Sequence, residues 1–72
     1  MEIKCRLKEI RKEKRISQIK LQMDTGIEQA LISKFENNVR TPTTEALVIF
    51  ANYFGVSIDY LLYRTNNPNP ND

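Results

Sequence analysis

Hydrogen-bonding side chains gather within the stretch GIEQALISKFENN, residues 26–38. Gln29, Ser33 and Lys34 supply an amide, a hydroxyl and an ammonium group, and with Ala30 they recur at the spacing of one helical face. The opposite face is apolar. These groups can donate and accept hydrogen bonds, so the outer face is either a solvated surface or a surface that recognises a ligand.

The residues that catalysis usually needs are missing from this sequence. It has no histidine and no glycine-rich phosphate loop, and its one cysteine, Cys5, excludes both a disulfide within the chain and a Cys/His zinc site. Glu9 and Glu13 are four residues apart but interleave with lysine and arginine, which is typical of surface charge pairing. We therefore expect no enzyme, no catalytic residue, no metal site and no cofactor, and we interpret Cys5 as an incidental or interface thiol.

Charge is distributed unevenly along the chain. Residues 1–20 carry eight basic and three acidic side chains, a net +5, whereas residues 21–72 carry three basic and six acidic ones, a net −3. One end of the molecule is therefore electropositive and suits a polyanion. On charge alone, a solvated basic helix face is the simpler explanation.

Apolar side chains follow a helical period along most of the chain, and no alternating run predicts a strand. Ile3, Leu7 and Ile10 form the stripe of a first helix, from Ile3 to about Lys14. The further helices are expected at 18–25, at about 28–37, from a cap at Thr43 to about Phe54, and at 58–63. In the fourth helix the buried face comprises Leu47, Phe50, Ala51 and Phe54.

Capping residues mark the ends of these helices. Hydroxyl side chains that can accept a bond from a first-turn N–H stand at Ser17, Thr43 and Ser57. Residues suited to the left-handed conformation that ends a helix are Gly26, Asn38 and Gly55. We therefore predict one all-α domain over residues 1–64.

The last residues, TNNPNPND, hold no apolar side chain and two prolines. Such a segment buries too little surface to offset the entropy of ordering, so residues 65–72 are expected to form a disordered polar tail. The sequence contains no apolar run long enough to span a bilayer and no signal-peptide pattern, which favours an intracellular protein.

The second and third helices form the clearest motif. A capped helix, a tight turn at Gly26 and a second short helix follow one another, and apolar residues stand where the two helices can fix their crossing: Leu21, Ile27, Ile32 and Phe35. This pattern is typical of a helix-turn-helix, which supports its second helix from behind.

From Ile3 to about Tyr63 the sequence resembles the phage Cro/CI repressor-like (XRE) helix-turn-helix family. The matching segments are LKEIRKEKRISQ at residues 7–18, the Gly26–Ile27 turn, ISKFENN at residues 32–38, Pro42 with Glu45 and Leu47, and FGVSIDYLL at residues 54–62. Several spaced motifs agree in order and distance. The resemblance implies a compact five-helix lambda-repressor-like fold that binds double-stranded DNA, with the helix-turn-helix formed by helices 2 and 3.

The resemblance also assigns roles to individual positions. Base reading from the first two turns of the third helix falls on Gln29, Ala30, Ser33 and Lys34, whose side chains suit adenine, a thymine methyl group and guanine. Phosphate binding falls on Gln18, Asn37, Asn38 and Arg40, and Gln18 can also buttress the first reading residue. Arg11 and Glu36 correspond to an ion pair that joins the first helix to the third. The family's two-fold dimer contact corresponds to Tyr60, Leu61 and Tyr63, although Leu61 equally fits a role in closing the core.

Some positions depart from the family pattern. Gln22 replaces a small alanine, so we expect looser packing there or an amide that reaches water. Glu28 stands where a serine or threonine usually caps the third helix, and it leaves that helix nearly neutral. Ile19, Met23 and Ile49 are apolar where polar residues are usual, so they are candidates for a patch that binds a partner.

We therefore predict a sequence-specific DNA-binding transcriptional regulator, a repressor that acts as a homodimer on a two-fold operator. The resemblance implies a cytoplasmic protein of bacterial or phage origin. The alternative is a helix-turn-helix module that binds another protein, in the manner of an antitoxin or a regulator-binding domain, with weak or no specific DNA binding.

Overall fold

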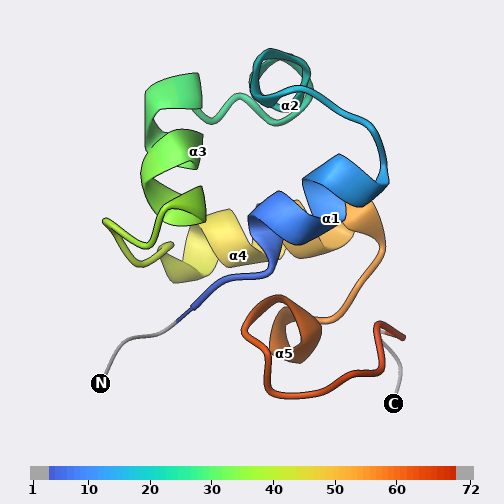
Figure 1. Cartoon of the computed structure of the whole chain (residues 1–72). Coiled ribbons are helices and arrows are strands. Elements are labelled where there is room, and N and C mark those ends of the chain that lie inside the picture. Colours follow the sequence, from blue (N-terminus) through green and yellow to red (C-terminus); the bar gives the residue numbers. More distant parts are fainter. Residues whose placement is uncertain (1–3, 70–72) are drawn as a thin grey trace.

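The computed structural model describes residues 4–69, and within that range the chain folds into five helices and no strand. They are α1 (Leu7–Glu13), α2 (Gln18–Thr25), α3 (Gln29–Glu36), α4 (Thr44–Phe54) and α5 (Ile58–Leu61). Figure 1 shows α2 and α3 joined by a short turn, α1 and α4 crossing beside them, and α5 closing the opposite end. The predicted all-α, five-helix fold is confirmed.

The predicted capping residues hold the helix ends. Three hydroxyls each accept a hydrogen bond from the backbone N–H three residues later, as the capping rule requires; they belong to Ser17, Thr43 and Ser57. Gly26 and Gly55 end α2 and α4 with φ of 80° and 67°. Asn38, also predicted, has φ 59°, and Arg15 and Tyr63 adopt the same left-handed conformation without a sequence signal.

The predicted first helix is too long at its start. It begins at Leu7, because the N–H of Arg6 donates to the carbonyl oxygen of Leu61 at 2.7 Å and so ties residues 4–6 to α5. Cys5 lies in this lead-in and is buried in the core, so it is not an exposed interface thiol; that it is incidental stays a prediction. Burial raises the pKa of the Cys5 thiol, which keeps it protonated. Ile3, the first residue of the predicted stripe, lies outside the described residues.

Two other helices are shorter than predicted. α3 covers Gln29–Glu36 instead of 28–37, and α5 ends at Leu61 instead of Tyr63. Tyr63 itself has φ 60°, so the chain leaves the helical conformation there.

The core is built from apolar side chains of all five helices, and α4 supplies four of them, Ala46, Leu47, Phe50 and Ala51. Phe35 of α3 and Phe50 of α4 meet edge to face, with ring centroids 6.2 Å apart. The other fully buried side chains come from α1, α2, α3 and α5, and they are Leu7, Leu21, Ile32 and Leu61. Every helix therefore contributes to one core, which fixes α3 from behind.

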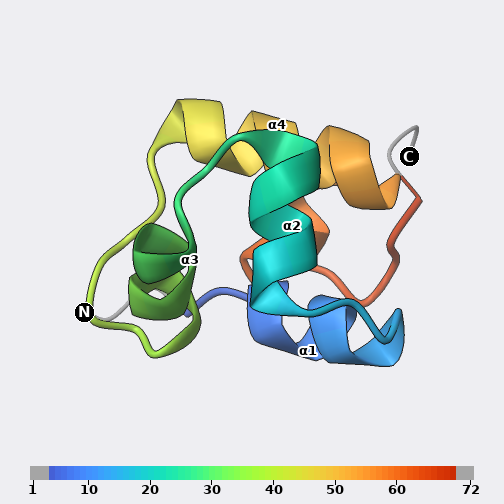
Figure 2. The same ribbon diagram turned by 90° about the horizontal axis from the view of Figure 1, so that it is seen from above.

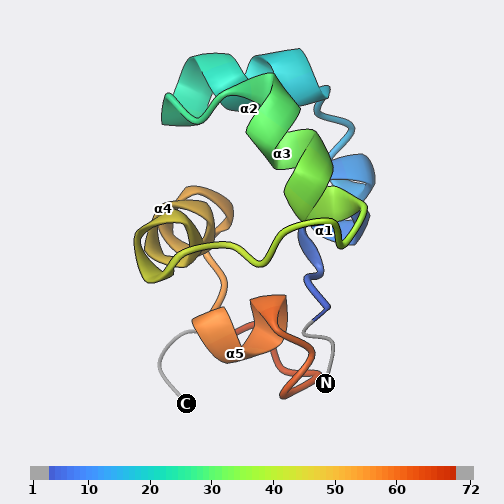
Figure 3. The same ribbon diagram turned by 90° about the vertical axis from the view of Figure 1, so that its left-hand side faces the viewer.

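The turn between α2 and α3 leaves one side of α3 uncovered. The hydroxyl of Thr25 donates to the carbonyl oxygen of Leu21 at 2.7 Å and accepts from the N–H of Ile27 at 3.2 Å, which closes the end of α2 around Gly26. Seen from the side of α3 in Figure 3, no other helix stands in front of it. The helix-turn-helix predicted from the sequence therefore has the required geometry.

Residues 65–69 run back along α5. The guanidinium of Arg6 donates to the carbonyl oxygen of Thr65 at 3.1 Å, and the N–H of Ser57 donates to that of Pro68 at 3.0 Å. The division into a domain over 1–64 and a disordered tail over 65–72 stays a prediction, and residues 1–3 and 70–72 lie outside the described range.

We expect Gly26→Ala to lower the free energy of unfolding by about 1 kcal/mol. A Cβ atom at Gly26 would meet nothing within 4 Å, so the loss comes from the left-handed backbone and not from a clash. Gly26→Asn should cost less, because asparagine tolerates this conformation. Urea unfolding measures both, and an alanine variant as stable as the wild type would contradict the assignment.

Candidate nucleic-acid interface

The outer face of α3 carries the four predicted reading residues. Ala30 and Lys34 are exposed, and Gln29 and Ser33 are half-buried at its margin. On the opposite side Ile32 and Phe35 are fully enclosed in the core. The structure therefore brings the four residues together on one face of α3, opposite the face that enters the core.

A side chain from α2 caps the start of α3. The N-cap residue, Glu28, makes no side-chain capping bond, whereas Oε1 of Gln22 accepts from the N–H of Gln29 at 2.6 Å. The looser packing or water contact expected at Gln22 stays a prediction, but its amide oxygen also satisfies an N–H that the first turn of α3 leaves unpaired. No sequence spacing signals a cap that comes from the preceding helix.

The predicted ion pair between Arg11 and Glu36 is present and nearly dry. Arg11 donates to Oε2 of Glu36 at 2.6 Å and to Oε1 at 3.0 Å, and it also donates to the carbonyl oxygen of Ile16 at 2.7 Å. Only 1% of the Glu36 side chain is exposed. The hydrogen bond to this carboxylate raises the pKa of Arg11. The pair thus joins α1 to the last turn of α3.

A chain of two amides connects this ion pair to the reading face. Nε2 of Gln18 donates to Oε1 of Glu36 at 3.0 Å, and Oε1 of Gln18 accepts from Nε2 of Gln29 at 2.6 Å. A carboxylate can only accept, so it turns the NH2 group of Gln18 toward itself and leaves the oxygen for Gln29. The charge of Glu36 therefore sets which way the Gln29 amide points.

The predicted phosphate-binding residues lie in the loop after α3 and at the start of α2. Asn37, Asn38 and Arg40 are exposed in the loop after it, and Nδ2 of Asn37 also donates to the hydroxyl of Ser33 at 3.3 Å. Gln18 stands at the start of α2, but its side chain is taken up by the amide chain described above. A phosphate near Gln18 would therefore meet the free N–H groups of the α2 N-terminus.

Two of the residues predicted for the dimer contact, Tyr60 and Tyr63, are contacted by Arg6 of the same chain. Its guanidinium lies over the rings of Tyr60 and Tyr63, 4.3 and 4.1 Å from their centroids, and it donates to the carbonyl oxygen of Tyr60 at 2.8 Å. Leu61 is fully buried, so it has the core-closing role that the sequence left open. Tyr63 remains 47% exposed.

The outer face of α2 carries an exposed apolar pair. Ile19 and Met23 stand one turn apart and are 54% and 75% exposed, whereas Ile49 on α4 is half-buried. Beside them, Asp24 pairs with Lys20 at 3.0 Å and accepts from the hydroxyl of Tyr53. The bond from Tyr53 and then that from Lys20 lower the pKa of Asp24, so this link between α2 and α4 weakens as the carboxyl is protonated in acid.

Other kinds of site find no support among residues 4–69. No group of three or more histidine, cysteine, aspartate or glutamate side chains is placed to hold a metal ion there. Within the same residues, every helix is too short or too polar to cross a membrane.

Comparison with known proteins points to the same motif. A family model described as a helix-turn-helix domain matches residues 5–67. The chain is 32% identical over 65 residues to YobD of Bacillus subtilis (strain 168), which is named as an uncharacterized HTH-type transcriptional regulator. This alignment covers 90% of the chain but 58% of YobD, so the chain spans less than two thirds of that relative. No solved structure matches the chain significantly.

Removing Arg11 should destabilise the fold strongly. We expect Arg11→Ala to lower the free energy of unfolding by about 3–5 kcal/mol, because it leaves the Glu36 carboxylate buried and unpaired. Arg64→Ala is the matched control: its contact with Asp59 is 3.9 Å long and both side chains are largely exposed, so the loss should stay below about 0.5 kcal/mol. Equal losses in urea unfolding would show that the buried pair has no special weight.

Proposed function

Because the chain belongs to the Cro/CI repressor-like family of helix-turn-helix proteins, we propose that it is a transcriptional regulator that reads double-stranded DNA with α3 in the major groove. A helix-turn-helix domain is a binding fold and not an enzyme. The observation that carries the proposal is the outer face of α3, on which an amide of fixed orientation stands beside exposed polar and cationic groups.

The orientation of Gln29 matches one base in particular. Its Nε2 atom gives one hydrogen to Gln18 and keeps a second, and no described residue donates to its Oε1 atom. A free N–H beside a free carbonyl oxygen is the pattern that pairs with N7 and the amino group of adenine. We therefore assign adenine to the base pair that faces Gln29.

The other reading residues complete the proposed footprint. The ammonium group of Lys34 suits guanine, and the methyl group of Ala30 suits a thymine methyl group. Ser33 already accepts from Asn37, so its hydroxyl hydrogen is the group left for a base. Phosphate contacts at the α2 N-terminus and at Asn38 and Arg40 would fix the register.

Two copies of the chain would bind a two-fold operator with their α3 helices one helical turn of DNA apart, about 34–36 Å. The exposed side of Tyr63, with Tyr60 behind it, is the proposed contact between copies. In this arrangement bound protein would occlude promoter DNA, which favours repression. Such a regulator acts where bacterial DNA lies, in the cytoplasm.

A second function is favoured by a separate observation. Ile19 and Met23 expose more than half of their surface on the outer face of α2. Such a patch suits a protein partner, which would make the domain an interaction module. Selection from random duplex DNA distinguishes the two functions: enrichment of a palindromic site supports the regulator, and no enriched site together with a stoichiometric protein partner supports the module.

Mutation of a base-reading residue and of a phosphate-binding residue should change DNA binding in different ways. We expect Lys34→Ala to weaken binding to the selected site by about 1–3 kcal/mol and to relax preference at one base pair. Arg40→Ala should weaken binding to all duplexes alike and lower the slope of log K against log salt concentration by about 1. Titration of both variants at several salt concentrations checks this, and wild-type affinity in both would refute the assigned roles.

The hydrogen bonds that join Gln29, Gln18 and Glu36 lead to a further prediction about base preference. Gln29→Ala should remove about 1–3 kcal/mol of discrimination for adenine at one base pair. Gln18→Ala should relax the same base pair although Gln29 is still present, because the freed amide can turn either way. Binding to operators that differ only at that base pair measures the effect, and full adenine preference in Gln18→Ala would contradict the proposed orientation.

A further inference from the structure

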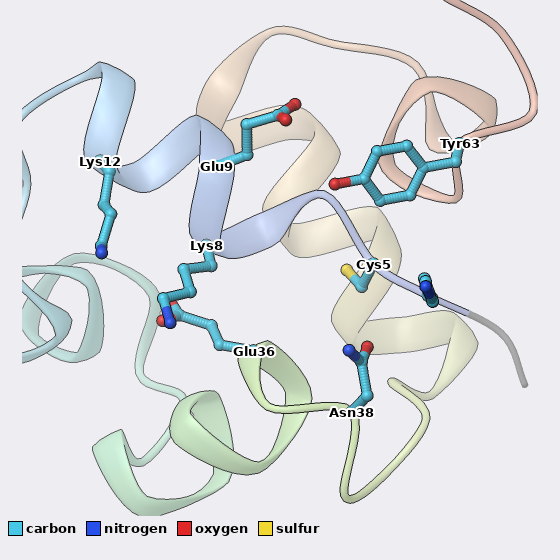
Figure 4. A pocket seen from close by; sticks show the side chains of 8 residues that line it. Cys5, Lys8, Glu9, Lys12, Glu36, Asn38 and Tyr63 are labelled. Atoms are coloured by element: carbon cyan, nitrogen blue, oxygen red, sulfur yellow. The ribbon is translucent and has the colours of Figure 1, made fainter.

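A basic hollow lies between α1 and the end of α3. Figure 4 shows Lys8 and Lys12 projecting from α1 over it, with Asn38 entering from the loop after α3. Lys4, in the lead-in to α1, also borders it. The four-residue spacing puts Lys8 and Lys12 on one side of α1, and Lys4 borders the same hollow from the lead-in.

The acidic residues of this hollow are already neutralised. Glu9 is paired with Arg6 at 3.1 Å, and Glu36 is paired with Arg11 at 2.6 Å. Neither arginine borders the hollow. Lys4, Lys8 and Lys12 make no ion pair within 4.0 Å in the described part of the chain, so their charges face the hollow uncompensated.

The position of the hollow connects it to the reading helix. Asn38, a predicted phosphate-binding residue, borders it directly. In Figure 2 the lead-in before α1 passes close to the loop that follows α3, and Figure 3 shows both on the same edge of the molecule. A duplex that received α3 in its major groove would therefore bring a backbone toward this edge.

We propose that the hollow is a second phosphate-binding surface, which holds the DNA backbone beside the groove that α3 enters. The inference rests on the proposed function. Lys8 and Lys12 are one helical turn apart, about 6 Å, and Lys4 lengthens the row, so it spans more than one phosphate group. A strand with a charge about every 3.4 Å of helix axis matches such a row better than a single small anion does. The row also adds positive charge beside α3, which carries a single cation, Lys34.

The test is the salt dependence of DNA binding by the full chain. In the triple variant Lys4→Gln, Lys8→Gln, Lys12→Gln, the slope of log K against log salt should fall by about 2–3, since each phosphate that is no longer neutralised lowers it by about 0.9. Affinity should fall equally on the selected site and on random duplex, because phosphates carry no sequence. Lys14→Gln is the matched control: Lys14 ends the same helix but borders a different hollow, beside Phe54 and Gly55, and its slope should stay at the wild-type value.

Replacement of the same three lysines by arginine keeps the charge and should keep the slope. A glutamine variant with the wild-type slope overturns the inference, as does an arginine variant whose slope falls as far as that of the glutamine one. If the wild type selects a site while the glutamine variant keeps its slope, the proposed function stands and this inference fails. If the wild type binds no duplex, both fail.

Discussion

The buried contact between Arg11 and Glu36 determines how α1, α2 and α3 are arranged relative to one another. A carboxylate with 1% of its side chain exposed is stable only if its oxygens are fully hydrogen-bonded, and here Arg11 and Gln18 supply the donors. These donors come from α1 and α2, whereas the carboxylate ends α3. The hydrogen bonds that this one carboxylate requires therefore fix three helices relative to one another. Through Gln18 they also set the orientation of the Gln29 amide.

Base recognition and binding of the DNA backbone are assigned to different parts of this domain. The reading face of α3 carries a single cation, Lys34, and is held rigid by its cap from Gln22 and by the amide chain. Uncompensated charge lies instead on α1 and in the loop after α3, where it would act on the backbone without regard to sequence. Because the outer face of α3 is nearly neutral and the basic residues lie beside it, contacts with the bases, and not the overall charge, set the preference for a DNA site.

The helix ends could be predicted from the sequence because each depends on only a few neighbouring residues. Ser17 and Gly26 act on their own few residues, so their types and positions sufficed to place the ends of α2. The Arg11–Glu36 pair came from the family resemblance, since the two residues are 25 positions apart. The resemblance also led us to expect the contact of Gln18 with Gln29. The cap from Gln22, the bond from Gln18 to Glu36 and the burial of Cys5 depend on how whole elements pack, and no short pattern records that. The reading and phosphate contacts need a bound duplex before they can be tested.

On this account, Gln29 meets DNA with an orientation set by Glu36 through Gln18. A crystal structure of the chain on its selected operator tests this most directly. We predict α3 in the major groove, with Oε1 and the second N–H of Gln29 on an adenine and the bonds from Gln29 to Gln18 and from Gln18 to Glu36 intact. A complex with another surface on the DNA, or with the Gln29 amide turned away from Gln18, would contradict it.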